Sequence, residues 1–141
     1  MMYLLDTDVV SSLLKRVPST TLIGKLASVL PEQQSTTSIT VGELVYGAHK
    51  AQERTDAVLE QMDKRILPDL PVLPFDAGAA RRYGELRAWL ERQGMSLGEA
   101  DLRIAAIALS RGLTVVTGNV RHFSRIPGLP VENWFLEPGS L

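Results

Sequence analysis

Short, continuously apolar runs alternate with longer stretches in which apolar residues recur at helical spacing. The first run, Tyr3–Asp6, has the length of a strand and stays apolar until its last residue, as in strands covered on both faces. Helically spaced apolar residues follow it, and this succession repeats along the chain. No two strand-like runs are joined by a link as short as a hairpin turn. The pattern predicts an α/β fold: a short parallel sheet of four or five strands with helices on both faces.

Five segments are expected to be strands: Tyr3–Asp6, Ser35–Ile39, Val72–Phe75, Leu113–Thr117 and Val131–Phe135. The third contains Pro74, which cannot donate a backbone hydrogen bond, so this strand is expected at an edge of the sheet or to end early. The apolar spacing predicts helices within residues 9–14, 22–30, 40–48, 57–67, 76–93 and 96–112.

Two sequences, Thr40–Glu43 and Ser96–Glu99, match the capping-box pattern and are expected to begin helices. The polar stretch 49–56 is expected to connect two helices. There is no internal repeat, low-complexity tract or linker. Residues 1–136 are therefore expected to form a single domain, followed by a C-terminal tail at 137–141.

The amino-acid composition limits which kinds of metal site and binding partner are possible. The chain of 141 residues has no cysteine and only two histidines, which excludes thiolate sites and leaves a zinc site only if carboxylates supply most ligands. The formal net charge is −1, so a nucleic acid would have to be held by a local basic patch. No apolar run approaches the ~20 residues of a membrane span. Without a signal-peptide pattern at the N-terminus, a cytoplasmic protein with no membrane partner is expected.

Polar residues gather at the predicted strand ends. Asp6, Glu43 and Asp101 stand beside strand ends or near helix starts, and Asn119 follows the last clear strand. Because ligands bind outside the carboxyl ends of strands in open α/β sheets, these four positions are expected to meet in one cleft.

Simpler interpretations exist for most of them. Asp6 or Asp8 could cap the first helix, Glu43 could complete its capping box, and Asn119 is a typical turn residue. Asp101 is harder to explain in this way. If Ser96 caps its helix, Asp101 lies beyond the first turn at the edge of an apolar run, where a carboxylate needs a partner or a metal.

Three carboxylates brought close together repel one another, and a divalent cation relieves that repulsion. Oxygen ligands select hard ions, so Mg²⁺ or Mn²⁺ is expected, and the chemistry predicted is metal-assisted phosphodiester hydrolysis. The hydroxyls of Thr7, Ser38 and Thr117 could orient these carboxylates. Basic residues near the acids are expected to hold an RNA backbone: Lys15, Arg16, Arg103 and Arg121.

Four segments together resemble the PIN-domain ribonucleases, and specifically the VapC toxins of type II toxin–antitoxin modules. They are residues 4–9 (LLDTDV), 38–47 (SITVGELVYG), 94–106 (GMSLGEADLRIAA) and 115–123 (VVTGNVRHF). The resemblance implies a three-layer PIN fold and Mg²⁺- or Mn²⁺-dependent endonucleolytic cleavage of RNA. It also implies a cognate VapB-type antitoxin that blocks the site, and homodimers are common in the family.

By position, the resemblance makes Asp6, Glu43 and Asp101 the metal ligands. Asn119 stands where many PIN domains have a fourth acid, and some relatives carry that acid three positions later, where this chain has His122. The site is therefore expected to carry less negative charge than in four-acid members, which favours one metal ion over two. Asp8 stands where asparagine is more usual and could partly compensate for the missing acid.

Two other functions fit parts of the sequence. The segment from Asp6 to Val10 resembles the nucleophile motif of haloacid-dehalogenase-type phosphohydrolases, in which Asp6 attacks phosphate and Asp8 acts as acid and base. Alternatively, the domain binds RNA or a protein without efficient cleavage. We further hypothesise that an antitoxin places a basic side chain among the acids and packs near Leu13, Leu14 and Tyr46.

Overall fold

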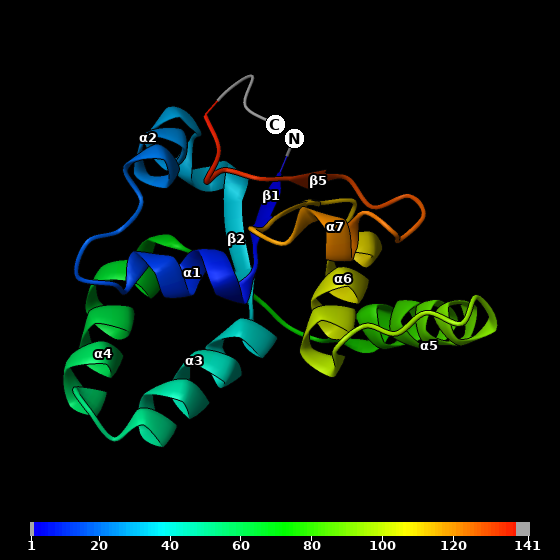
Figure 1. Cartoon of the computed structure of the whole chain (residues 1–141), viewed down its shortest axis with the longest axis horizontal. Helices are drawn as coiled ribbons and strands as arrows, with labels where there is room; N and C mark the ends of the chain where they lie inside the picture. The colour runs from blue at the N-terminus through cyan, green and yellow to red at the C-terminus, as the bar shows by residue number, and fades with distance from the viewer. Residues whose placement is uncertain (1, 138–141) are drawn as a thin grey trace.

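The computed structural model describes residues 2–137, and within them a five-stranded sheet forms the centre of the molecule (Figure 1). The strands are β1 (Tyr3–Leu5), β2 (Gln34–Thr37), β3 (Val72–Leu73), β4 (Thr114–Val116) and β5 (Val131–Glu132). Their order is β3-β2-β1-β4-β5, and every pairing is parallel. The predicted parallel sheet is confirmed. β3 forms an edge and ends before Pro74, as expected from the missing proline donor.

Helices connect the strands. They are α1 (Thr7–Leu13), α2 (Thr20–Ser28), α3 (Ser38–Ala51), α4 (Thr55–Gln61), α5 (Ala77–Arg92), α6 (Glu99–Arg111) and α7 (Val120–Phe123). Short irregular helical turns complete the connections at Pro31–Gln33, Met62–Ile66 and Leu67–Asp69.

The sheet separates two hydrophobic cores, so the helices cover both of its faces (Figure 1). Because successive side chains of a strand point to opposite faces, Leu4 packs with α5 and α6 while Leu5 packs with α1, α2 and α4. Val115 and Val116 of β4, which pair with these leucines, divide in the same way. The predicted three-layer α/β arrangement is confirmed.

The central position of β1 sets the place of the acids. β1 pairs with β2 on one side and with β4 on the other, and all three strands run in the same direction. Their carboxyl ends therefore open on one edge of the sheet, where the chain continues into Asp6, α3 and Thr117.

Two helix starts differ from the prediction. α3 begins at Ser38, because the side chain of Thr37 accepts a hydrogen bond from the Thr40 backbone N–H. The expected capping box at Thr40–Glu43 is wrong, and β2 ends at Thr37 where the prediction ran to Ile39. Thr37 was a missed capping signal, since threonine at the end of a polar strand serves equally well as a cap.

The second capping box is also wrong. α6 begins at Glu99 after Gly98, with no side-chain cap, so Ser96 lies outside the helix. Asp101 is consequently in the first turn of α6, where the helix dipole favours a carboxylate. The prediction that Asp101 lies beyond the first turn is wrong.

The chain between α3 and α5 also departs from expectation. α3 continues to Ala51, which leaves a connection of only three residues before α4. Gln52 and Arg54 adopt left-handed backbone conformations there, which permit the sharp reversal. The helix predicted over residues 57–67 is divided into α4 and two irregular turns.

Among the described residues, no helix is long and apolar enough to cross a membrane. Of the predicted tail, only Glu137 is described, and it accepts a hydrogen bond of 2.9 Å from the Thr21 hydroxyl of α2. Residues 138–141 lie outside the described part of the chain.

The two-core arrangement predicts the effect of truncating β1. Leu4 is fully buried in the core beneath α5 and α6, so Leu4→Ala is expected to lower the free energy of unfolding by about 2–5 kcal/mol. Val17 is 84% exposed, and Val17→Ala should change it by less than about 0.5 kcal/mol. Urea unfolding followed by circular dichroism measures both. Equal destabilisation of the two variants would contradict this packing.

Candidate active site

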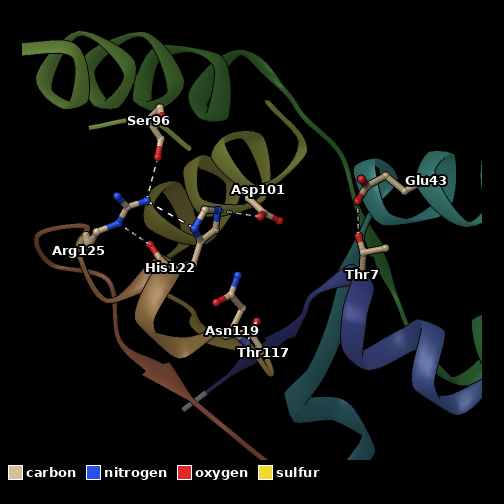
Figure 2. Close-up of polar contacts among 8 residues, drawn as sticks. All are labelled: Thr7, Glu43, Ser96, Asp101, Thr117, Asn119, His122 and Arg125. Carbon is tan, nitrogen blue, oxygen red and sulfur yellow. Dashed lines mark hydrogen bonds and ion pairs between the residues drawn. The ribbon is translucent and has the colours of Figure 1, made fainter. Parts of the chain in front are cut away.

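A cavity of about 270 Å³ opens at the edge of the sheet where the strands end. It is lined by Asp6, Thr7, Asp8, Glu43, Asp101, Asn119 and Phe123. These residues come from the end of β1, from α1, α3, α6 and α7, and from the turn between β4 and α7 (Figure 2). The four positions predicted to meet, residues 6, 43, 101 and 119, therefore do line one cavity, and Asp8 joins them.

Asp6 is the most buried of the acids, with 3% of its surface exposed. It is the N-cap of α1, and its Oδ1 accepts a hydrogen bond of 3.0 Å from the Val9 backbone N–H. Its own backbone N–H donates to the Val116 carbonyl oxygen, and the Thr117 hydroxyl hydrogen-bonds to its side chain. The carboxylate is thus fixed between the ends of β1 and β4.

Asp8 lies one residue inside α1, in its first turn, and lines the cavity. Because Asp6 caps this helix, the interpretation of Asp8 as the cap is wrong. The two acids nevertheless face a shared space, since Asp8 contributes electrostatic repulsion at both Asp6 and Asp101. Asp8 therefore supplies a fourth carboxylate to the cavity.

Glu43 is held by a line of hydroxyl groups. The Thr7 hydroxyl donates to Glu43 Oε1 at 2.5 Å (Figure 2), and its oxygen lies 3.0 Å from the Thr40 hydroxyl. Since the single Thr7 proton goes to Glu43, Thr40 donates to Thr7, and Thr40 in turn accepts from Thr37 at 3.4 Å. These hydrogen bonds connect the end of β2 to a cavity-lining carboxylate.

Asp101 is held from the other side by His122. The Nε2 atom of His122 lies 3.2 Å from Asp101 Oδ2, and the guanidinium of Arg125 lies 3.5 Å from His122 Nδ1 (Figure 2). An arginine can only donate, so Nδ1 accepts and Nε2 carries the proton that bonds Asp101. Arg125 is itself fixed by donating to the carbonyl oxygens of Ser96 and His122.

Asn119 sits on the turn between β4 and α7. Its backbone N–H donates to the Thr117 hydroxyl oxygen at 2.9 Å, and its side chain lines the cavity. Thr117 thus joins the turn to Asp6, which agrees with the orienting role expected for its hydroxyl.

Burial and nearby negative charges raise the pKa values of two acids in the cavity, Asp6 and Asp101. Burial, with repulsion from Asp8 and Asp101, raises the pKa of Asp6 to about 7, although hydrogen bonds from Thr117 and Val9 oppose the rise. The pKa of Asp101 is also raised, mainly by burial and further by Glu43 and Asp8, against the opposing effect of His122. The surroundings in the cavity therefore disfavour the ionised form of both carboxyl groups.

The donor chemistry of the cavity suits a hard divalent ion, because four carboxylates supply only oxygen and their mutual repulsion would be relieved by a cation. In residues 2–137, however, no three His, Cys, Asp or Glu side chains are gathered closely enough to hold an ion. Glu43 and Asp101 instead turn to Thr7 and His122 (Figure 2). Binding an ion would require the carboxylates to draw together.

Several predicted residues lie outside the cavity. Ser38 is the exposed first residue of α3 and does not line it. Lys15 and Arg16 are exposed beyond the end of α1 opposite to Asp6. Arg103 forms an ion pair of 3.3 Å with Glu99, and Arg121 is exposed on α7. The role proposed for these basic residues in binding RNA stays a prediction.

The supporting residues have only weak signals in the sequence. Thr40 matches a capping pattern, and His122 and Arg125 stand close together in the short segment that follows Asn119. The polar strand 34–37 before the helix that carries Glu43 was the signal for the threonines, since buried hydroxyls need partners.

The raised pKa of Asp6 predicts how stability depends on pH. Between pH 3.8 and about 7 the folded protein binds more protons than the unfolded chain, so stability should fall as pH rises through this window.

The variant Asp6→Asn keeps the side-chain cap of α1 and removes the negative charge. In EDTA at pH 8 it should stabilise the protein by up to about 4 kcal/mol, as measured by urea unfolding. Asp63→Asn, at an exposed acid outside the cavity, is the control. Parallel pH profiles for Asp6→Asn and wild type would contradict the assignment.

Comparison with known proteins places this site in a family. The chain matches the PIN domain over residues 3–129. It is 40% identical over 134 residues to the tRNA(fMet)-specific endonuclease VapC of Shigella flexneri, covering 94% of this chain and 97% of that protein.

Solved structures agree. A DNA-bound VapBC from Salmonella typhimurium superposes with a TM-score of 0.81 at 40% identity, covering 95% of this chain and 98% of that chain. FitAcB from Neisseria gonorrhoeae gives a TM-score of 0.86 at 31% identity, covering 96% and 100%. The resemblance found in the four sequence segments is confirmed: the chain belongs to the PIN-domain family and, within it, to the VapC proteins.

Proposed function

We propose that the protein is a Mg²⁺- or Mn²⁺-dependent endoribonuclease that acts as the toxin of a type II toxin–antitoxin system. One observation carries the proposal. Carboxylates from positions 6, 8, 43 and 101 line a single cavity at the carboxyl edge of the sheet, and Asp6 among them is buried with its pKa raised to about 7. Such crowding is costly to a protein unless a cation offsets it, and it places the groups where a phosphate could approach the ion.

Each side chain has a part in this proposal. Asp6, Glu43 and Asp101 would hold the ion, and Asp8 would add the carboxylate that Asn119 and His122 do not provide. When bound, the ion would supply an activated water and stabilise charge on the phosphate. Asn119 would hydrogen-bond a water or phosphate oxygen in the same cavity.

The hydrogen-bond partners would position these groups. Thr7 and Thr40 orient Glu43, and His122, backed by Arg125, orients Asp101. Because each bond uses one carboxylate oxygen, Oε1 of Glu43 and Oδ2 of Asp101, the second oxygen of each group can turn to an ion. Partners of this kind commonly tune metal ligands.

Solved relatives include a member of the VapBC family of toxin–antitoxin systems and a toxin–antitoxin complex, and we propose an antitoxin partner here. An antitoxin segment with a basic side chain would neutralise the acids of the cavity and exclude RNA. Of the apolar residues expected to receive it, Leu14 is buried in the core and Leu13 packs against the core, so only Tyr46 is exposed. A homodimer and a cytoplasmic location complete the proposal.

Initiator tRNA is the first substrate to test. Relatives from Shigella flexneri and Salmonella typhimurium, 40% and 41% identical over 134 residues, are named tRNA(fMet)-specific endonucleases. We propose that this chain likewise cuts a structured RNA at an unpaired loop, where the phosphate backbone can enter an open cavity.

The nuclease activity can be tested with initiator and elongator tRNA transcripts. Cleavage of the initiator transcript is expected with Mg²⁺ or Mn²⁺ and should disappear in EDTA. Asp6→Asn and Asp101→Asn should each slow it at least about 100-fold, because an ion's stabilisation of the transition state is worth several kcal/mol. Gel electrophoresis of end-labelled RNA measures the rates.

Asp63→Asn serves as the matched acid-to-amide control and should cleave at the wild-type rate, since Asp63 is exposed and outside the cavity. Cleavage that persists in EDTA, or in both cavity variants, would overturn the proposal. Absence of metal-dependent cleavage across tRNA and total RNA would favour a module that only binds RNA or a protein.

The variant Asp8→Asn distinguishes the proposed nuclease from the phosphohydrolase alternative. An acid–base role for Asp8 predicts complete loss of phosphatase activity toward p-nitrophenyl phosphate. In the nuclease, Asp8 only supplements three other carboxylates, so the variant should retain RNA cleavage reduced by roughly 3- to 30-fold, in the range of losses for supporting groups. The described cavity lining includes no lysine to hold a phosphate, which favours the nuclease. Phosphatase activity that is present in the wild type and lost in Asp8→Asn, without RNA cleavage by either protein, would reverse this preference.

A further inference from the structure

One aromatic side chain is exposed beside the acid cavity. Tyr46, in the middle of α3, exposes 64% of its surface and belongs to neither hydrophobic core. An aromatic ring usually contributes to folding by burying its large apolar area. Tyr46 contributes little in this way, so its ring is available to a ligand.

Its position on α3 connects it to the cavity. In a helix, residues at i, i+3 and i+7 lie on one side, so Glu43, Tyr46 and Lys50 form a continuous row. Glu43 lines the cavity, Tyr46 lies about 4.5 Å further along the helix axis, and Lys50 about 10 Å further. The buried residues Thr40, Leu44 and Ala48 form a different face, so this row looks outward.

The row combines two groups that bind nucleotides. The Lys50 ammonium lies 5.6 Å from the centre of the Tyr46 ring, close enough for a cation–π interaction. The next residue, Gly47, has no side chain that could cover the ring, and no residue beyond its own helix neighbours lies within 4 Å of the position that its Cβ would take. An accessible ring flanked by a cation is the combination that stacks a base and contacts the phosphate backbone of a single strand.

We propose that Tyr46 stacks on an unpaired base of the RNA next to the cleaved phosphate, and that Lys50 contacts a phosphate of the same strand. This inference rests on the proposed nuclease function and adds a binding role for two residues outside the cavity. The neighbours of Tyr46 favour RNA as the ligand of the ring, and an antitoxin that reached Tyr46 would compete with RNA for it. Gly42, Gly47 and His49 are exposed and polar or small, so no apolar cluster typical of a protein interface surrounds the ring.

Binding can be measured without cleavage in the Asp6→Asn background. The probe is a short single-stranded RNA of mixed sequence carrying fluorescein, and anisotropy gives its Kd. Tyr46→Ala should weaken binding about 5- to 100-fold, whereas Tyr46→Phe and Tyr46→Trp keep a stacking ring and should stay within about 3-fold of the parent. Leu30→Ala, at a residue that is 58% exposed on another part of the surface, should have no effect.

The contribution of Lys50 is measured separately, through the salt dependence of RNA binding. A lysine that contacts a phosphate releases counterions, so Lys50→Met should reduce the slope of log Kd against log salt concentration by about 0.7. Tyr46→Ala should weaken binding without a comparable change in this slope. An unchanged slope for Lys50→Met would remove Lys50 from the proposal.

A scan with abasic RNA tests the stacking itself. Removing one base at a time should identify a position that weakens binding as much as Tyr46→Ala, and the two losses should not add in the Tyr46→Ala protein. Additive losses at every position, or equal losses for Tyr46→Ala and Tyr46→Phe, would overturn the proposal. A change of mass in light scattering, with RNA affinity unchanged, would assign Tyr46 to contact between two copies of the chain.

These results are independent of whether the protein cleaves RNA. If the wild type fails to cut RNA with Mg²⁺ or Mn²⁺ but affinity depends on Tyr46 as described, the nuclease proposal fails and the stacking site stands. If cleavage occurs and Tyr46→Ala leaves both Kd and KM unchanged, the stacking site fails alone.

Discussion

The burial of the Asp6 carboxylate is the constraint on which the site depends. A central strand delivers it to the edge of the sheet with 3% of its surface exposed, between the first turn of α1 and the end of β4. Hydrogen bonds from Val9 and Thr117 compensate only part of the lost hydration, so its pKa remains raised. The fold therefore maintains an unfavourable charge at the point where a divalent ion would be most strongly attracted.

The surrounding acids are held by separate supports. Threonine hydroxyls from β2, α1 and α3 hold Glu43, while His122 and Arg125 hold Asp101. The two supports belong to opposite sides of the cavity, and neither depends on the other (Figure 2). Such an arrangement keeps mutually repelling groups apart in the protein alone, so the carboxylates would have to draw together to share a cation.

Sequence patterns predicted the larger features because they depend on local and repetitive signals. The apolar run ending at Asp6 and the strand before Thr117 followed from hydrophobicity and length. Both capping boxes were wrong because a hydroxyl residue three positions before a glutamate does not by itself determine where a helix begins. The choice of Thr37 over Thr40, and of Gly98 over Ser96, depends on where β2 and the preceding loop leave the chain.

The sequence by itself determined the α/β order of elements, the parallel sheet and the meeting of Asp6, Glu43, Asp101 and Asn119 at one edge. These follow from strand direction, because parallel strands place all their carboxyl ends together. The tertiary structure decided that Asp8 enters the cavity and that His122 binds Asp101. Both depend on the rotation of a helix about its axis and on side-chain contacts between segments far apart in the chain. Such long-range packing has no signature in residue spacing.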